Sequence, residues 1–571
     1  MAEEKVIDKA PSGSNGLYDN EKHSNTGSDA DVGVIERDNS DQLKRHLGNR
    51  QIQLIAIGGA IGTALFVSIG GGLQKGGPGS LLIAYMIQAV MVALITTGLA
   101  EMTVYMPISG SFIRFAGNWV DEAWGFMTGY NFFFYATNTP QEAFLIPFEI
   151  AALNLVLQFW SDKIPVAAVI VACIVLYAAL NVIAVEYFGE AEFWLAGGKV
   201  ILILIVFSFT FITMVGGNPQ KDAYGFRYWK NPGAFAEHLD TGALGQFHGF
   251  MGALGSAVFT VVGPEYLAMV AGEAERPRVY LKAGFKTVYW RFGFFFICGA
   301  LACGIILPYN DPQLDNAGSG TADGSPYVIA MGNMGIDVLP HVVNALLCTS
   351  IFSAGNAYTY CSMRCLYGLA LQGHAPAFLK KCLKNGIPIY CFAVVMLFPF
   401  LTFFQVSAGT AKVVSLLQSL TSASGLINYI SIGVTYIHFH RATKAQGLDR
   451  RTLPFRGYCQ PYLAYVGVAW MVLMVLTFGY TVFMGPFVAL DFFSYYLMVL
   501  VGILTYGGWK LLKRTHHVRP EEADLIWDKP VIDAYEAKFT EQPTRFRDDF
   551  KKILRLGKKS KNQEEIAANP S

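Results

Sequence analysis

The sequence predicts an all-α polytopic membrane protein with about twelve transmembrane helices, and three observations support this fold class. Hydrophobic residues make up 53% of the 571 residues and charged residues only 15%, whereas soluble domains carry about 25% charge. Long apolar runs recur along the chain, and positive charge gathers in alternate connections between them. The formal net charge of +1 gives no sign of nucleic acid binding.

The composition divides the chain into three parts. Residues 1–45 are rich in Ser, Asn, Gly and Asp, and we expect a disordered cytosolic tail because such a segment can bury little apolar surface. Residues 46–514 form the predicted transmembrane domain. Residues 515–571 turn polar and charged again, and we expect a second cytosolic tail there.

Apolar runs of roughly 20 residues recur from Gln51 onward, and each is long enough to cross a hydrocarbon core of about 30 Å. We number the predicted spans one to twelve in chain order. They cover residues 50–71, 79–104, 123–157, 164–186, 190–216, 246–271, 286–307, 337–370, 388–405, 411–438, 460–484 and 487–512.

The charge of the connections predicts the orientation, because cytosolic loops of membrane proteins carry an excess of Lys and Arg. The connections after spans six, eight and ten are rich in both residues, whereas the loop after span seven, residues 310–337, has neither. The loop after span five is a mild exception, with Lys221, Arg227 and Lys230. Both tails are therefore predicted to lie inside.

Span one contains the run IGGAIGT, residues 57–63, with three glycines among five residues. Each glycine weakens a helix by about 1 kcal/mol, and irregular backbone survives in a membrane only where it is buried or lines a cavity. A break here would present backbone N–H groups that suit a carboxylate. The alternative is close helix packing through small residues, and span one alone does not separate the two interpretations.

Span six contains a second interruption, VFTVVGPE, which places Gly263, Pro264 and Glu265 in mid-membrane. Proline removes a backbone donor and clashes with the preceding turn, so the helix is expected to break. The alternative for Glu265 is a structural, hydrogen-bonded carboxyl group. Two interrupted spans that lie five spans apart are typical of an inverted repeat with a binding site at the midplane, which indicates a transporter.

Charged residues inside the spans need a reason, because one at the bilayer centre costs at least about 2.5 kcal/mol. Lys199, early in span five, either extends to the cytosolic interface or is buried, where desolvation would let it load and release a proton. Glu101 is expected to face the inner interface. Arg364 is either a topology anchor or part of a gate, and Glu149 in span three is given no role.

Five runs identify a resemblance: IAIGGAIGTALF, AEMTVYMPISGSF, FGEAEFWLAGGKV, AGEAERPR and SAGNAYTYCSMRCLYGLALQGHAP. The stretch from Leu43 to about Lys513 resembles the fungal amino acid permeases of the amino acid–polyamine–organocation superfamily. The run from FGEAEF to KNPGAF and the later YNDPQL are most similar to permeases for dicarboxylic amino acids. A branch linked to carnitine and polyamines is a near neighbour.

The resemblance implies a LeuT-type fold, in which spans one to five and six to ten form two inverted repeats, and amino acid uptake coupled to protons. It implies that Lys199 occupies the place of a sodium ion and takes part in proton coupling, with no other cofactor. It also implies that the span-six half of the pocket receives the α-amino group of the substrate. This half is made of Phe259 (a gate candidate), Thr260 and Gly263, and we place Glu265 in it as well. The backbone predicted to hold the α-carboxylate is that of Gly59, Ala60, Ile61, Gly62 and Thr63.

This chain departs from the family pattern in span three, where the segment from Ala136 to Gln141 makes it about six residues longer. The segment is either an insertion near the substrate pathway or sequence kept by an error in the gene model. Both interpretations weaken an inference of substrate preference from relatives, because span three packs near the site.

The leading hypothesis is a proton-coupled amino acid importer of the plasma membrane, with acidic amino acids favoured by the resemblance. The first alternative is a nutrient receptor that signals through its tails, where Lys5, Lys9 and Lys22 are available for ubiquitin ligase adaptors. The second alternative is a broad-range, carnitine or polyamine permease. An enzyme is not indicated, because the sequence shows neither a nucleophile–base pair nor a metal cluster.

Overall fold

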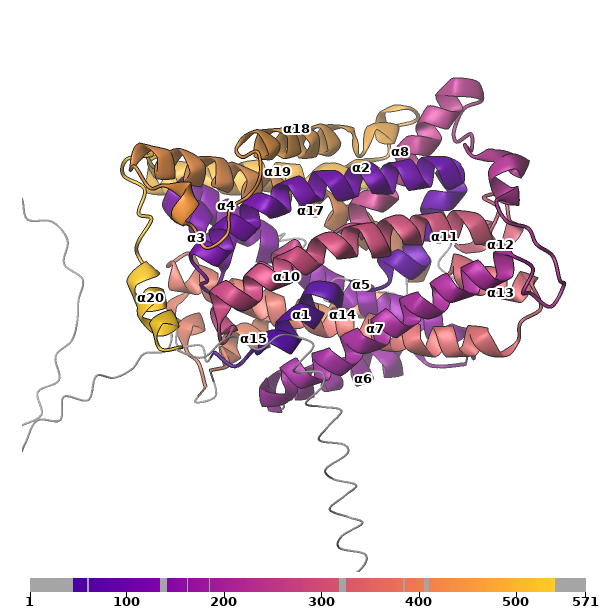
Figure 1. Cartoon of the computed structure of the whole chain (residues 1–571), viewed down its shortest axis with the longest axis horizontal. Coiled ribbons are helices and arrows are strands. Elements are labelled where there is room, and N and C mark those ends of the chain that lie inside the picture. Colours follow the sequence, from indigo (N-terminus) through magenta and orange to yellow (C-terminus); the bar gives the residue numbers. More distant parts are fainter. Residues whose placement is uncertain are drawn as a thin grey trace, which may run out of the picture. The chain divides into compact units, whose positions relative to one another are not determined.

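A computed structural model describes residues 45–58, 61–133, 141–161, 163–183, 185–317, 325–383, 386–404 and 410–539 (Figure 1). All statements below concern the compact unit 38–571, since residues 1–37 lie outside the described part. The described residues are mostly helical, and their β pairing is confined to the isolated bridges Leu47–Ala274 and Asp121–His517. The all-α prediction is confirmed.

Spans one to five of the prediction coincide with helices or interrupted helix pairs. Span one is α1 followed, after a break, by the π-helical turn η1 and the start of α2, and span two is the rest of α2. The left-handed backbone of Gly77 (φ 73°) separates the two spans inside α2, just before Pro78. The bounds are α1 (Asn49–Gly58), η1 (Ala64–Ser68), α2 (Ile69–Tyr105), α4 (Glu122–Phe133), α5 (Gln141–Gln158), α6 (Val166–Ala178), η2 (Ala179–Ile183) and α7 (Val185–Met214).

Spans six to twelve also coincide with helices. Span six is again a pair, α8 and α9, and span nine is the pair α15 and η8. The bounds are α8 (Gly242–Thr260), α9 (Pro264–Met269), α10 (Pro277–Arg291), η5 (Phe292–Ile297), α11 (Cys298–Ile306), α14 (Val338–Leu371), α15 (Ile389–Val395), η8 (Phe398–Phe404), α17 (Thr410–Ala445), α18 (Tyr462–Thr477), η10 (Tyr480–Phe483) and α19 (Ala489–Lys513).

Short helices fill the connections between spans. They are α3 (Ser111–Trp119), η3 (Trp229–Gly233), η4 (Ala271–Glu273), α12 (Pro312–Ala317), α13 (Pro326–Asn333), η7 (Ala377–Lys380) and η9 (Arg450–Thr452). One more short helix, α20 (Lys529–Ala537), follows the last span. Within the described residues, seven stretches are long and apolar enough to cross a membrane, and three shorter apolar helices coincide with spans three, four and nine.

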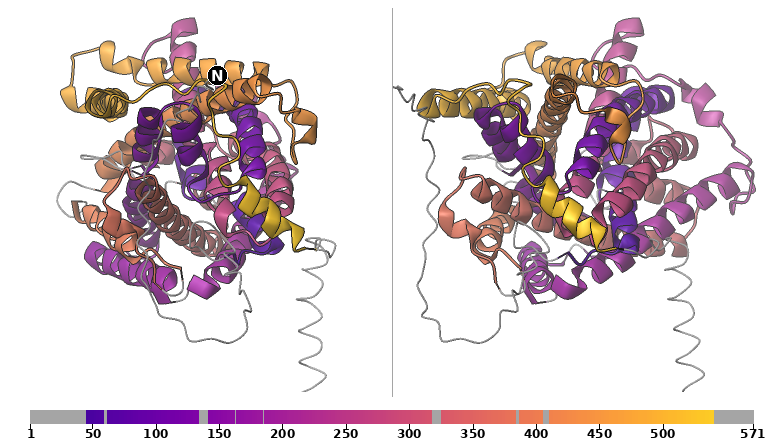
Figure 2. Two further views of the ribbon diagram at one scale, coloured as in Figure 1. Left: turned by 90° about the vertical axis from the view of Figure 1, so that its left-hand side faces the viewer. Right: turned by 60° about the vertical axis from the view of Figure 1, so that its left-hand side comes forward.

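The helices pack so that interrupted spans lie at the centre and apolar faces lie outside. Helix α2 packs along α8, and α14 packs along α5 and α7 (Figure 2). The outer helices α7, α18 and α19 leave large apolar side chains such as Phe211, Leu476 and Leu504 exposed. An exposed apolar surface of this kind is what a lipid-facing helix presents.

The beginning of the predicted C-terminal tail is bound to the transmembrane domain. Residues 515–539, which we call the C-terminal strap, cross the side on which the Lys- and Arg-rich connections lie. Val518 N–H donates to Val120 O (2.9 Å), and the indole N–H of Trp119 donates to Asp524 O (2.8 Å). The strap therefore has defined contacts, whereas residues 540–571 lie outside the described part.

The strap also contacts later parts of the chain. The side-chain amide of Gln446, which directly follows α17, donates to Ala523 O (2.6 Å). Arg278, at the start of α10, pairs with Asp533 at 2.6 Å. The strap therefore joins elements of both halves of the predicted repeat.

Candidate functional site

The first interruption lies between α1 and η1. Gly59 and Ala60 lie outside the described residues, so the predicted carboxylate site can be followed only at Ile61, Gly62 and Thr63. Ile61 is fully buried, and its carbonyl accepts a hydrogen bond from Ser350 Oγ (3.2 Å). A break at the predicted place is confirmed, because helix α1 ends at Gly58 and helical backbone resumes only at Ala64.

The second interruption separates α8 from α9. Helix α8 ends at Thr260, and Gly263 takes a φ of 124°, which a side-chain-bearing residue rarely adopts. Pro264 then begins α9, a position where its missing N–H costs nothing. Both interruptions predicted from the sequence are present.

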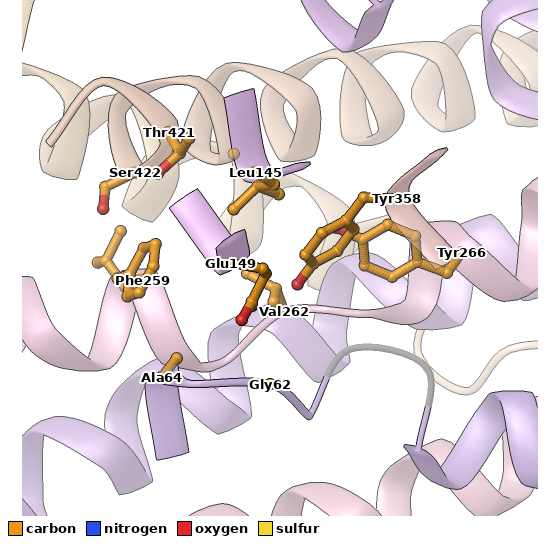
Figure 3. A pocket seen from close by; sticks show the side chains of 12 residues that line it. Gly62, Ala64, Leu145, Glu149, Phe259, Val262, Tyr266, Tyr358, Thr421 and Ser422 are labelled. Carbon is orange, nitrogen blue, oxygen red and sulfur yellow. The ribbon is translucent and has the colours of Figure 1, made fainter. Parts of the chain in front are cut away.

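The two interruptions face a common, narrow cavity of about 20 Å³ (Figure 3). Its residues come from both interruptions and from the helices packed against them. The cavity is lined by Gly62, Ala64, Leu145, Glu149, Val258, Phe259, Val262, Tyr266, Tyr358, Thr421, Ser422 and Gly425. Of the predicted binding residues, Gly62 and Phe259 therefore line the cavity.

Other predicted residues lie beside the cavity and have structural partners. Thr260 Oγ1 accepts a hydrogen bond from the Tyr85 hydroxyl (2.9 Å) and donates to Ser256 O (2.8 Å). Glu265 is buried and accepts hydrogen bonds from Gly263 N–H (3.2 Å) and the Tyr429 hydroxyl (3.1 Å). Thr260, Gly263 and Glu265 are not among the residues that line this cavity.

A larger cavity lies beside the central one. It holds about 420 Å³, and it shares Ser422 with the central cavity. Its lining extends from Thr63, in the break of span one, to Lys75, His248 and Tyr480. These last three residues lie near span ends that are predicted to face outside. We call this cavity the outer vestibule, since it opens on the predicted outer side.

The predicted cytosolic side of the same helices is held by buried ion pairs. Arg364 Nε contacts Glu273 Oε1 at 2.7 Å, both side chains are 2% exposed, and the guanidinium lies 4.1 Å from the centre of the Tyr360 ring. Arg364 is therefore paired inside the protein, and its role in a gate stays a prediction. The vestibule opens on the predicted outer side, whereas this buried pair lies on the predicted cytosolic side.

The prediction from the sequence that Glu101 faces the inner interface is wrong. It is fully buried, and Arg450 donates two hydrogen bonds to its carboxylate, at 2.8 and 2.7 Å. The N–H of Gly457 and the hydroxyl of Tyr436 also donate to it. Its partners lie more than 300 positions away, so the local sequence gave no sign of this contact.

Lys199 is fully buried in α7, and the snorkelling interpretation is wrong for this structure. Its ammonium lies 3.9 Å from Glu192 Oε1, and Ser353 of α14 donates a hydrogen bond to Glu192 (3.0 Å). Lys199 does not line the central cavity but interacts electrostatically with Glu149, which does. The lysine therefore lies behind the cavity wall.

Sequence reasoning missed Glu149 and Glu192. Glu192 precedes Lys199 by seven positions, which is two helical turns and the same helix face, so this spacing could have identified the pair. Glu149 had a weaker signal, since it is one of two carboxylates in span three. Glu142, the other one, belongs to a part of α5 whose side chains lie outside the described structure, and of the segment from Ala136 to Gln141 only the backbone of Gln141 is described.

Comparisons with known proteins agree with this architecture. The sequence profile of the family described as amino acid permease matches residues 51–520. The chain is similar to the general amino acid permease AGP2 of Saccharomyces cerevisiae, with 42% identity over 506 residues, which cover 87% of this chain and 84% of that protein. It is 35% identical to the dicarboxylic amino acid permease of the same yeast, over 92% of this chain and 86% of that protein.

Two further comparisons extend this result. The lysine/arginine permease CAN1 of Candida albicans is 35% identical over 90% of each chain. Among solved structures, the manganese transporter of Eremococcus coleocola superposes with a TM-score of 0.52 at 12% identity, covering 88% of this chain and 99% of that one. This likeness concerns the fold alone, and it supports the LeuT-type architecture predicted from the two interrupted spans.

Proposed function

Because the chain belongs to the amino acid permease family, whose members are transporters and not enzymes, we propose that it imports amino acids across the plasma membrane together with protons. One observation carries this proposal: the interruptions of spans one and six border the same cavity, which lies beside an outer vestibule. We also propose that both termini lie in the cytosol, because the connections after spans six, eight and ten are rich in Lys and Arg.

The interruptions supply the backbone groups that an amino acid needs. N–H groups at the break of span one have no helical partner and suit the α-carboxylate. Carbonyl groups at the break of span six suit the α-ammonium, and Phe259 lies between the cavity and the vestibule side of α8 as a gate. Alternating access then requires the Arg364–Glu273 side to open while the vestibule closes.

We propose that Lys199 carries the coupling proton. Its ammonium is fully buried, so its charged form depends on the carboxylates nearby, Glu192 and Glu149. A substrate charge that enters the cavity beside Glu149 changes that balance. Substrate binding is therefore linked to the protonation of Lys199 through the cavity wall. In this proposal protons are the only coupling ion, and no further cofactor takes part.

We propose a general range of amino acids, because the relatives are named for different substrates: general, dicarboxylic, and lysine or arginine. The resemblance alone favours the dicarboxylic class.

We also propose that the N-terminal tail binds ubiquitin ligase adaptors through Lys5, Lys9 and Lys22. These lysines lie outside the described residues.

Uptake of labelled lysine, alanine and glutamate tests the proposal, in yeast cells that lack their own amino acid permeases. We expect accumulation of at least one of them above cells with an empty vector, greater at acidic than at neutral external pH, and abolished by a protonophore. Absence of uptake by protein shown to reach the plasma membrane would contradict the transport proposal. Substrate binding without accumulation would favour a receptor.

Gly62→Ala is expected to weaken uptake strongly. A Cβ at this position would lie 2.4 Å from Glu149 Oε1 and 3.0 Å from the Ala354 Cβ, so the cavity wall would have to shift. Overpacking of this kind costs about 1–3 kcal/mol, or roughly tenfold in uptake at low substrate concentration. Gly508→Ala is the matched control, because a Cβ there meets nothing within 4 Å. Equal uptake by both variants would show that the break of span one is not part of the site.

A further inference from the structure

Glu149 projects from α5 into the space between the two interruptions (Figure 3). Its side chain is 2% exposed, and Thr63 Oγ1 donates a hydrogen bond to its Oε2 (2.6 Å). Its Oε1 takes up the space beside Gly62, since a Cβ on that glycine would come within 2.4 Å. The carboxylate is thus fixed beside Gly62 and Thr63 and faces the cavity, where we expect it to lie next to the α-ammonium and the side chain of a substrate.

Two buried cations lie outside the cavity lining. Lys199 lies 3.9 Å from Glu192 and also interacts electrostatically with Glu149. Arg291 interacts electrostatically with Glu265 and donates a hydrogen bond to Val262 O (2.7 Å). Among the lining residues that the structure describes, Glu149 is the titratable carboxylate, and none is Lys, Arg or His.

Aromatic rings complete the surroundings. Phe259, Tyr266 and Tyr358 line the cavity, and the rings of the two tyrosines are 5.6 Å apart. The faces of aromatic rings attract ammonium and guanidinium groups. A carboxylate among aromatic rings is a surrounding that suits a cation and repels an anion.

We infer that Glu149 determines the substrate class of this cavity, which accepts amino acids with cationic or neutral side chains and rejects dicarboxylic amino acids. The inference rests on the proposed transport function. Either ammonium group of a cationic amino acid can pair with Glu149, whereas a side-chain carboxylate meets a like charge that no described lining residue neutralises. The dicarboxylic preference that the resemblance implies is thereby replaced by a preference for the opposite charge.

Glu149→Gln tests this directly, since glutamine keeps an oxygen for Thr63 and removes the charge. Uptake of lysine, alanine and glutamate is measured for wild type, Glu149→Gln and the control Glu122→Gln, whose carboxylate is exposed on the other end of span three. For wild type and Glu122→Gln we expect lysine to exceed glutamate about tenfold or more. In Glu149→Gln this ratio is expected to fall about tenfold.

A binding measurement keeps the test decisive if Glu149→Gln does not transport. The thermal stabilisation of purified protein by each amino acid is compared, and lysine should stabilise wild type more than glutamate does, with the difference lost in Glu149→Gln. A wild type that prefers glutamate, or a ratio unchanged in Glu149→Gln, would overturn the inference and leave transport intact. If no amino acid is taken up or stabilises the protein, the proposed function fails as well.

Discussion

Replacing Lys199 with methionine is expected to abolish proton-driven accumulation, so that uptake no longer rises when the external pH is lowered. The ammonium is fully buried and 3.9 Å from Glu192, so no other described group in α7 can take its place beside that carboxylate. The measurement is the accumulation ratio of a labelled amino acid at acidic and at neutral external pH. Accumulation that keeps the wild-type pH dependence would exclude Lys199 from coupling.

The variant also leaves Glu192 buried without its cation, and breaking a buried pair costs about 3–5 kcal/mol. Lys199→Met combined with Glu192→Gln removes this unpaired charge, so we expect the double variant to recover membrane abundance but not coupling. Lys230→Met is the matched control, because Lys230 is exposed in the loop after span five. Recovery of coupling in the double variant would show that the lysine acts only on stability.

Replacing Arg364 with alanine is expected to lower stability by about 3–5 kcal/mol, because it leaves the carboxylate of Glu273 buried and unpaired. The loss is read as a lower melting temperature of the purified protein and lower abundance in the membrane. Arg227→Ala breaks the exposed pair with Asp222 and should change stability by no more than about 1 kcal/mol.

A double variant separates stability from gating at this pair. Arg364→Met with Glu273→Met replaces both charges by apolar groups, which is often close to neutral for stability. We expect the double variant to be abundant but slow in uptake, because the contact that closes the predicted cytosolic side is lost. Wild-type uptake by the double variant would show that the pair is structural and not a gate.

Much of the fold could be predicted because the bilayer restricts the possible structures. Each predicted span coincides with a helix, since backbone in lipid must satisfy its own hydrogen bonds. The two interruptions could also be predicted, because Gly and Pro act on the local backbone.

The side chains that complete the site could not be predicted in the same way. Thr63 and Glu149 are 86 positions apart, and Arg364 and Glu273 are 91 apart, so neither contact leaves a local pattern. Sequence reasoning placed Glu265 in the pocket because it lies in the break. The structure instead turns its carboxylate to Tyr429 and brings Glu149 from another helix to the cavity.

The C-terminal strap has a thermodynamic consequence for whatever binds the tail. A partner that requires residues 515–539 as an extended peptide must first displace the contacts with Val120, Trp119 and Gln446. Its apparent affinity then equals its intrinsic affinity multiplied by the fraction of molecules in which the strap is released. Because Arg278 of the second repeat contacts the strap together with residues of the first, we expect motion between the repeats to change that fraction. We therefore expect recognition of the tail to be coupled to transport.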